Sequence, residues 1–310
     1  MTAPVLCIMG PTAVGKSELA LSLAERLGGE IVSVDSAQIY RGLDIGTAKP
    51  SPAVRARCPH HLIDIRDPAE RYSAAEFARD AQAAIAAIRS RGRLPVLVGG
   101  TGLYFQALQH GLSPMPAADA QVRAELEAEE AAYGVQALHR RLQAVDPESA
   151  ARLHPNDSQR IQRALEVHRL TGRPLSQVQR EPGQPGLTEM PLKIILEPPE
   201  RAWLHRRIEA RFRAMLAAGL VGEVVALHRR GDLSEELPAV RAVGYRQIWH
   251  YLEGACDYRT MIRRGLRATR QYAKRQITWL RGQTDGVRFT ADDRLEAQVH
   301  SYVTGALGGV

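Results

Sequence analysis

The stretch "GPTAVGKS" near the N-terminus has the residue types and the spacing of a phosphate-binding loop. It fits the pattern G-x-x-x-x-G-K-S/T at Gly10, Gly15, Lys16 and Ser17, and it follows an apolar run and precedes a helical pattern. Glycines let backbone N–H groups turn toward phosphate oxygens, and the start of the helix adds partial positive charge. Lys16 would neutralise an outer phosphate, and Ser17 could ligate Mg²⁺. We therefore expect a phosphate or diphosphate to bind Gly10, Pro11, Thr12, Ala13, Val14, Gly15, Lys16 and Ser17.

Asp35 ends the next apolar run, "EIVSVD", at the edge where ligands bind in open α/β sheets. Most hydrolases with this loop place their Mg²⁺-holding Asp after a later strand, but here "LPVLVGGTGLY" supplies glycines and Thr101. A water-activating ATPase is therefore disfavoured. We expect the Asp35 carboxylate to face the substrate. Helix capping or a turn is the alternative role for Asp35, and a structural role is the alternative for Thr101.

The first part of the chain alternates short apolar runs with helical patterns. Buried runs joined by helices predict a P-loop NTPase-like parallel sheet with helices on both faces, hence an α/β fold. "SAAEFARDAQAAIAAIRSRG" opens with a capping box, Ser73 and Glu76. The expected strands are 4–9, 30–35, 61–65, 94–99 and 192–196.

Two clusters of helix-breaking residues, "SPMPAAD" and "EPGQPGLTEMP", interrupt this alternation. Between them, 119–181 has helical patterns only. The chain therefore predicts a core of 1–112 and 191–310 with a helical insertion domain at 113–190. From 201 onward the core is expected to be mainly helical.

Positive charge is concentrated toward the C-terminus. The net charge of the 310 residues is +7, yet 201–281 alone hold 17 Arg or Lys against 7 Asp or Glu. On one helix over 258–281, the cationic residues share a face, which predicts a surface for a polyanion. A solvated charged face is the alternative interpretation. The face comprises Arg259, Arg263, Arg267, Arg270, Lys274 and Arg281.

Composition indicates a soluble protein. Hydrophobic residues make up 45% of the chain, but no apolar run approaches the roughly 18 residues that a membrane span requires. The three cysteines are scattered, and the N-terminus has no signal-peptide pattern. We expect a cytoplasmic monomer without a membrane partner.

Beyond these residues, most of the chain resembles the tRNA dimethylallyltransferases, also called tRNA isopentenyltransferases. The shared motifs occur in the family's order: "GPTAVGKS", "VDSAQIYRGLDIGTAKP", "HHLID", "YSAAEF", "LVGGTGLY", "NDSQRIQRALEV", "RAVGYRQ" and "KRQITWLR". The resemblance implies transfer of a dimethylallyl group from dimethylallyl diphosphate to the exocyclic amine of the adenine just 3′ of the anticodon, in tRNAs reading codons that begin with U. No C-terminal Cys/His zinc finger is present, which implies a bacterial form.

The resemblance also implies roles for individual residues. Asp35 would be the general base and Thr101 would steady the reacting centre, with Mg²⁺ on Ser17. "RAVGYRQ" would shape the substrate channel, with core packing as the alternative, and "QRIQR" alone would be a helix with a polar face. The residues implied to contact tRNA are Asp35, Ser36, Ala37, Gln38, Thr101, Arg123, Gln159, Arg160, Ile161, Gln162, Arg163, Arg241, Gly244, Tyr245, Arg246, Lys274, Arg275, Gln276 and Arg281.

Three other functions share some of these motifs. A small-molecule P-loop kinase would use the same loop for ATP and 113–190 as a lid. An adenylate isopentenyltransferase shares the loop and Asp35 but modifies a free nucleotide. A non-catalytic RNA-binding protein would leave Lys16 and Asp35 without a role.

Overall fold

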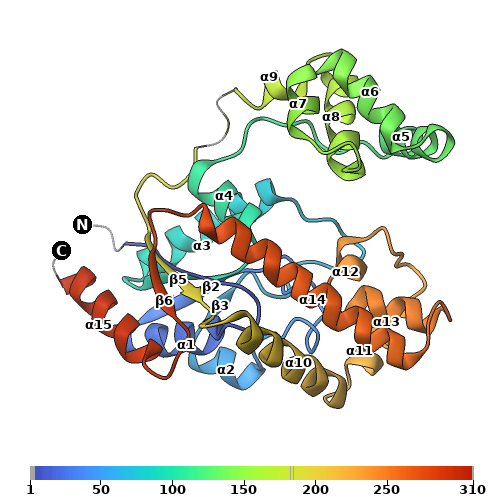
Figure 1. Ribbon diagram of the computed structural model, residues 1–310. Coiled ribbons are helices and arrows are strands. Elements are labelled where there is room, and N and C mark those ends of the chain that lie inside the picture. The colour runs from blue at the N-terminus through green and yellow to red at the C-terminus, as the bar shows by residue number, and fades with distance from the viewer. Residues whose placement is uncertain (1–3, 182, 184, 309–310) are drawn as a thin grey trace. The chain divides into compact units, whose positions relative to one another are not determined.

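The protein, as a computed structural model, is described for residues 4–181, 183 and 185–308, and it forms two compact units (Figure 1). The first unit comprises Met1–Gln109 and Leu187–Val310, and the second comprises His110–Gly186. The second unit thus occupies 110–186, where the sequence led us to expect an insertion at 113–190. Each unit has its own buried apolar cluster.

The first unit is built on a six-stranded sheet in which every neighbouring pair is parallel. The strand order is β3-β2-β4-β1-β5-β6, so β1 lies between β4 and β5. The α/β fold expected from the buried apolar runs is therefore confirmed. The strands are β1 (Leu6–Met9), β2 (Gly29–Val34), β3 (His60–His61), β4 (Leu94–Gly99), β5 (Leu192–Glu197) and β6 (Val287–Thr290).

Helices cover both faces of this sheet, as Figure 1 shows. Successive side chains of a strand point to opposite faces. Cys7 and Met9 accordingly pack in the cluster that includes α3, α4 and α14, whereas Leu6 and Ile8 pack in the cluster that includes α1 and α15. The helices of this unit are α1 (Lys16–Leu27), α2 (Pro52–Arg57), α3 (Ala74–Ser90), α4 (Gly102–His110), α10 (Arg201–Ala217), α11 (Leu220–His228), α12 (Pro238–Arg241), α13 (Tyr245–Leu252), α14 (Tyr258–Arg281) and α15 (Leu295–Gly308).

Local sequence signals account for several helix ends. The capping box at the start of α3 is confirmed: the Ser73 hydroxyl accepts from the Glu76 N–H, and the Glu76 carboxylate accepts from the Ser73 N–H. The long basic helix is also confirmed as α14. It begins after Asp257, whose carboxylate caps the helix by accepting from the Thr260 N–H. A single helix can therefore carry cationic groups along its whole exposed face.

The strand expected at 61–65 is wrong beyond its first residue. Leu62 and Asp64 adopt left-handed backbone conformations, with φ of 61° and 59°, which end the extended run after His61. The turn brings the Asp64 carboxylate to the buried Lys49 ammonium, at 2.6 Å, and to Arg55, at 2.8 Å. The need to pair this buried cation overrides the apolar pattern of the segment.

Strand β6 was not expected from the sequence. It lies at the edge of the sheet beside β5, and three of its four residues are exposed. An edge strand of this kind lacks the continuous apolar run that indicates a buried strand. Its pairing with β5 extends the sheet by one strand at the C-terminal end of the chain.

The regular elements of the second unit within the described residues are α-helices, as expected from the patterns at 119–181. Its core is formed by apolar residues that include Leu126, Leu142 and Leu165. The helices are α5 (Ala120–Tyr133), α6 (Val135–Val145), α7 (Pro147–Arg152), α8 (Ser158–Thr171) and α9 (Leu175–Val178).

Candidate active site

The glycine loop connects β1 to α1 and has the backbone of an anion-binding turn. Ala13 and Gly15 have positive φ, 65° and 107°, which turns the intervening N–H groups to one side of the loop. Gly10 has no room for a side chain, because an added Cβ would lie 2.9 Å from Val14 Cγ1 and 3.1 Å from the Leu196 carbonyl oxygen. Lys16 folds back over the loop, and its Nζ donates to the Pro11 carbonyl at 2.7 Å.

Gln276 of α14 fixes this loop to the end of β4. Its Oε1 accepts from the Thr12 N–H at 2.8 Å, and its Nε2 donates to the Gly100 carbonyl at 3.0 Å. The side chain is 6% exposed. The amide that the family resemblance assigns to tRNA is thus bonded inside the protein.

Replacing Gln276 should destabilise the protein, because Gln276→Leu leaves the Thr12 N–H and the Gly100 carbonyl without this partner. Each buried polar group left unpaired costs about 1–3 kcal/mol, so we expect the free energy of unfolding to fall by about 2–4 kcal/mol. Urea denaturation measures it. Gln271→Leu, at an exposed position of the same helix, is the matched control. Equal stability of the two variants would contradict the assigned bonds.

Asp35 lies in a tight turn at the end of β2. Its Oδ1 accepts from the N–H groups of Ala37, at 2.8 Å, and Gln38, at 3.3 Å. Nearby, the Thr101 hydroxyl accepts from the Ser36 N–H at 3.2 Å, which ties the end of β2 to the segment after β4. Only one carboxylate oxygen of Asp35 is used by the hydrogen bonds of the described residues, so the other is available to a substrate.

One pocket of about 240 Å³ joins the loop and the carboxylate. Among its lining residues are six that the sequence assigned to binding or catalysis: Thr12, Lys16, Ser17, Asp35, Gln38 and Gln276. Gly100 also lines it, and Thr101 follows directly in the chain. The phosphate-binding and base-bearing segments, which are separate in the sequence, therefore open into a shared space.

Arg211 and Tyr272 also line this pocket, and neither was expected at the site from the sequence. Arg211 lies three residues after Ile208 and seven after Leu204, both of which are buried on α10. An arginine on the apolar stripe of a helix is the signal that could have identified it. The Tyr272 ring, from α14, lies with the Arg275 guanidinium 5.7 Å from its centroid.

Two cations, Lys16 and Arg211, and two carboxylates, Glu18 and Asp35, line the pocket. Burial, and then the nearby positive charge of Arg211, lower the pKa of Lys16 to about 7. The pKa of Arg211 is also lowered by burial, while Asp35 opposes that shift. Burial and the Asp35 charge raise the pKa of Tyr272 to about 12. A multivalent anion would favour the charged forms of both Lys16 and Arg211, which burial disfavours.

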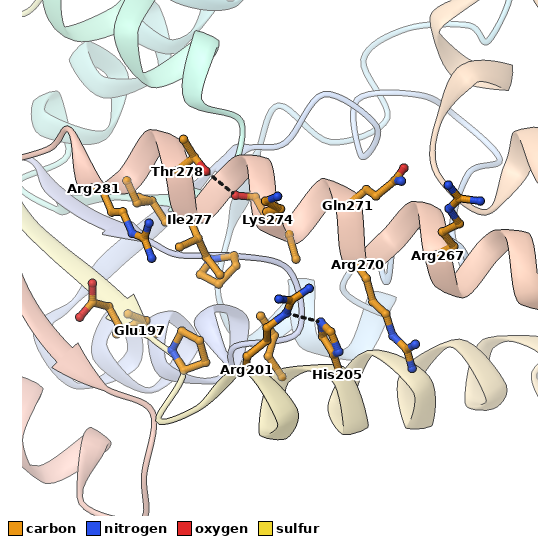
Figure 2. Close-up of a pocket in the computed structure, with 16 residues that line it drawn as sticks. Glu197, Arg201, His205, Arg267, Arg270, Gln271, Lys274, Ile277, Thr278 and Arg281 are labelled. Carbon is orange, nitrogen blue, oxygen red and sulfur yellow. Dashed lines mark hydrogen bonds between the residues drawn. The ribbon is translucent and has the colours of Figure 1, made fainter.

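A second, larger cavity of about 660 Å³ lies between α10 and α14. Figure 2 shows the side chains of Arg201, Lys274 and Arg281 extending into the space between the two helices. None of the three forms an ion pair within the described part of the chain, and Glu197 at its edge is bound to Arg288. The cavity thus exposes unneutralised positive charge next to the loop, where Pro11 forms part of its wall.

The cationic face of α14 is present, with one change from the expected set. The residues expected on it are exposed except Arg270, which is half-buried and lies 3.3 Å from a Glu209 carboxylate oxygen. The apolar side of the helix, including Met261 and Leu280, is buried. The stripe is therefore available to a polyanion except at Arg270.

Within the helical unit, the candidate RNA-binding residues differ in exposure and in their ion pairs, and Arg160 lies 3.5 Å from the Asp157 carboxylate. Gln159 and Arg160 are exposed, whereas Ile161 is buried in the core. Arg123 and Arg163 both bind the buried Glu166 carboxylate, at 2.9 and 2.6 Å. Burial alone would raise the pKa of Glu166, but the two arginines outweigh it and lower that pKa. Gln162 Nε2 donates to Glu130 at 2.7 Å.

The "RAVGYRQ" segment runs from the last residue of α12, Arg241, to the first turn of α13. Arg241 and Arg246 are exposed, and Arg246 lies 4.0 Å from Glu235. Gly244 has a φ of 96°, and Tyr245 is 1% exposed. Arg241 and Arg246 are accordingly the better candidates for an RNA contact. Tyr245 is part of the core, in agreement with the alternative that this segment serves packing.

The fold and the site place the protein in the class of P-loop α/β proteins that act on a phosphate-bearing substrate. Residues 38–283 match the family described as IPP transferase. A tRNA dimethylallyltransferase of Alkalilimnicola ehrlichii is 60% identical over 283 residues, covering 90% of this chain and 88% of that protein. One of Thioalkalivibrio sulfidiphilus is 54% identical over 314 residues, covering 100% and 98%. The chain therefore belongs to the IPP transferase family, whose relatives here are prenyltransferases.

Solved structures agree with this assignment. A full-length tRNA isopentenylpyrophosphate transferase from Bacillus halodurans has 41% sequence identity and a TM-score of 0.71, covering 99% of this chain and 97% of that one. A eukaryotic dimethylallyltransferase acting on tRNA has 28% identity and a TM-score of 0.77, covering 97% and 78%. The kinase and free-adenylate alternatives are not favoured by these relatives.

Proposed function

We propose that this protein transfers a dimethylallyl group from dimethylallyl diphosphate to the exocyclic N6 amine of the adenosine 3′-adjacent to the anticodon, in tRNAs reading codons that begin with U. The observation that carries the proposal is the pocket in which Lys16, Arg211 and Asp35 lie together. Cations there suit a diphosphate, and the carboxylate suits an amine that must lose a proton. The names of the relatives support a dimethylallyl donor and a tRNA acceptor.

Asp35 is the proposed general base. An adenine amine is a weak nucleophile because its lone pair is drawn into the ring, so its proton must leave as the new C–N bond forms. The bond from the dimethylallyl carbon to the diphosphate oxygen breaks at the same time, the diphosphate leaves, and the N6 proton passes to Asp35. Thr101 holds the Ser36 N–H and thereby steadies the turn that carries this carboxylate.

Residues 10–17 are the proposed diphosphate site, with Lys16 and Arg211 placed where negative charge grows on the leaving group. Mg²⁺ accepts oxygen ligands and usually keeps several waters, so one protein hydroxyl with phosphate oxygens suits it. Ser17, exposed and lining the pocket, would hold it. When bound, Mg²⁺ would neutralise part of the charge of the diphosphate.

The proposed RNA surface comprises the α14 stripe, the exposed Arg241 and Arg246, and the exposed Gln159 and Arg160 of the helical unit. The target adenosine must leave its stack to reach Asp35. Phosphate contacts would hold the anticodon arm while it does so. No helix in the described part of the chain could span a bilayer, and we propose a cytoplasmic monomer.

Transfer of label tests the function directly. Incubation with Mg²⁺, labelled dimethylallyl diphosphate and a tRNA that carries the target adenosine should place label in the RNA. The same tRNA with guanosine at that position is the control and should stay unlabelled. Label in free adenylate instead of tRNA, or turnover of ATP without RNA, would reject the proposal in favour of the alternative enzymes.

A further inference from the structure

The Glu223 carboxylate, in the first turn of α11, is surrounded by donors from a distant segment. Its Oε2 accepts from the N–H groups of Asp44, at 3.0 Å, and Ile45, at 2.7 Å, and its Oε1 accepts from Gly46 at 3.2 Å. Three consecutive backbone amides thus converge on one side chain that lies far away in the sequence. Hydrogen bonds to a charged acceptor are stronger than neutral ones.

Tyr245 completes this arrangement from α13. Its hydroxyl donates to Glu223 Oε1 at 2.5 Å. Burial, and then this bond to Glu223, raise the pKa of Tyr245, so the hydroxyl keeps its proton and remains a donor. Its ring packs directly on the backbone of Gly46, where an added Cβ would lie 2.5 Å from the ring. Glu223 and Tyr245 therefore hold 44–46 from two sides.

The segment held in this way continues into the wall of the reaction pocket. Thr47, Ala48 and Pro50 line that pocket. Gln38, which directly follows the Asp35 turn, donates from Nε2 to the Thr47 carbonyl at 3.3 Å and lies 3.5 Å from the Ala48 carbonyl. A shift of 44–46 would move the carbonyls that orient Gln38.

Lys49 is a further anchor for the same segment. The Lys49 ammonium, 2% exposed, donates to the Tyr40 carbonyl at 2.8 Å and to Asp44 Oδ1 at 2.5 Å. It also binds Asp64. Lys49 fixes the segment to its own neighbourhood in the sequence, whereas Glu223 and Tyr245 connect it to α11 and α13.

We propose that Glu223, together with Tyr245, is a positioning residue for the transfer reaction. It sets the location of the 47–50 wall and, through Gln38, the turn that presents Asp35 to the acceptor nucleoside. This inference rests on the proposed function, because the reaction it serves is dimethylallyl transfer. It gives the "RAVGYRQ" tyrosine a role other than contact with RNA.

The test compares Glu223→Gln with Glu236→Gln, a control at an exposed position nearby. In Glu223→Gln an amide donor replaces one of the two acceptor oxygens and faces the amides of 44–46. We expect single-turnover transfer to slow by about 10- to 100-fold, since small misplacement of reacting groups costs that much. Dissociation constants for tRNA and for inorganic pyrophosphate should change less than about threefold, and Glu236→Gln should match the unmodified protein.

Amide hydrogen exchange provides the second readout. Exchange at 44–46 should accelerate in Glu223→Gln, while the amides of β1 and β4 keep their protection. Unchanged exchange at 44–46, or a transfer rate equal to that of Glu236→Gln, would overturn the inference. Loss of protection in the central strands would also overturn it, because Glu223 would then be serving global stability.

Tyr245→Phe keeps the test decisive if Glu223→Gln does not fold. It removes one donor and leaves the three amides, so transfer should slow by roughly two- to fivefold, a smaller loss than that of the carboxylate. In the double variant the two losses should combine to less than their product, since both act on one contact. Independent losses would contradict the inference. If the unmodified protein transfers no label, the proposed function fails, whereas exchange at 44–46 still reports on the Glu223 contacts.

Discussion

Asp35→Asn is expected to lower the single-turnover rate of transfer by about 10²- to 10⁴-fold, the range that a general base contributes. Asparagine keeps a carbonyl oxygen that can accept from the N–H groups of Ala37 and Gln38, as Oδ1 of Asp35 does now. The turn should therefore persist while the proton acceptor is lost. Rapid-quench measurement with saturating tRNA and labelled dimethylallyl diphosphate gives the rate of the chemical step.

Asp35→Ala is the matched comparison, because it removes both the base and the turn contacts. We expect it to be at least as slow as Asp35→Asn, and we expect tRNA to bind both variants with nearly unchanged affinity. Transfer by Asp35→Asn at close to the normal rate would exclude Asp35 as the base. A large loss in Asp35→Ala alone would instead assign it to holding the turn.

The buried elements of the core could be predicted because their sequence signals are local. The apolar runs of β1, β2, β4 and β5 and the capping box of α3 each specify their own conformation. The segment after His61 could not be predicted in this way, because its conformation depends on the ion pairs of Asp64 with Lys49 and Arg55. Strand β6 depends on its neighbour β5 and on no apolar pattern of its own.

The site follows the same division. The loop and Asp35 were identified from their types and spacing, and the structure brings them into one pocket. Gln276 and Tyr245 were assigned to RNA through motifs, yet their side chains are buried and bonded to Thr12, Gly100 and Glu223. The motifs identify residues of one site, and the fold shows which of their side chains are hydrogen-bonded within the protein and hold that site in place.

Lys16→Met is expected to lower the transfer rate by about 10²- to 10³-fold, comparable to removing a preorganised donor from a developing negative charge. Methionine keeps an unbranched apolar side chain that is one atom shorter than the side chain of lysine, so the loop should remain folded. Arg211 stays in the pocket and would account for the residual rate. Single-turnover assays measure the loss, and a rate near normal would show that Lys16 does not meet the diphosphate.

The pH dependence of pyrophosphate binding tests the same contact through its charge. With the pKa of Lys16 near 7, the free protein has lost most of that charge above this pH. A diphosphate favours the charged form, so binding takes up a proton there, and affinity should fall as pH rises above 7, by at most about tenfold per pH unit. Calorimetry in buffers of different ionisation enthalpy counts that proton.

Lys16→Arg separates this effect from the titration of pyrophosphate itself. Arginine stays charged throughout the range, so the variant should lose the part of the pH slope that belongs to Lys16 and retain the part that belongs to the ligand. Identical slopes in the two proteins would mean that Lys16 is already charged before the ligand arrives. In that case burial and Arg211 would not depress its pKa, and the pocket would have less to gain from binding a diphosphate.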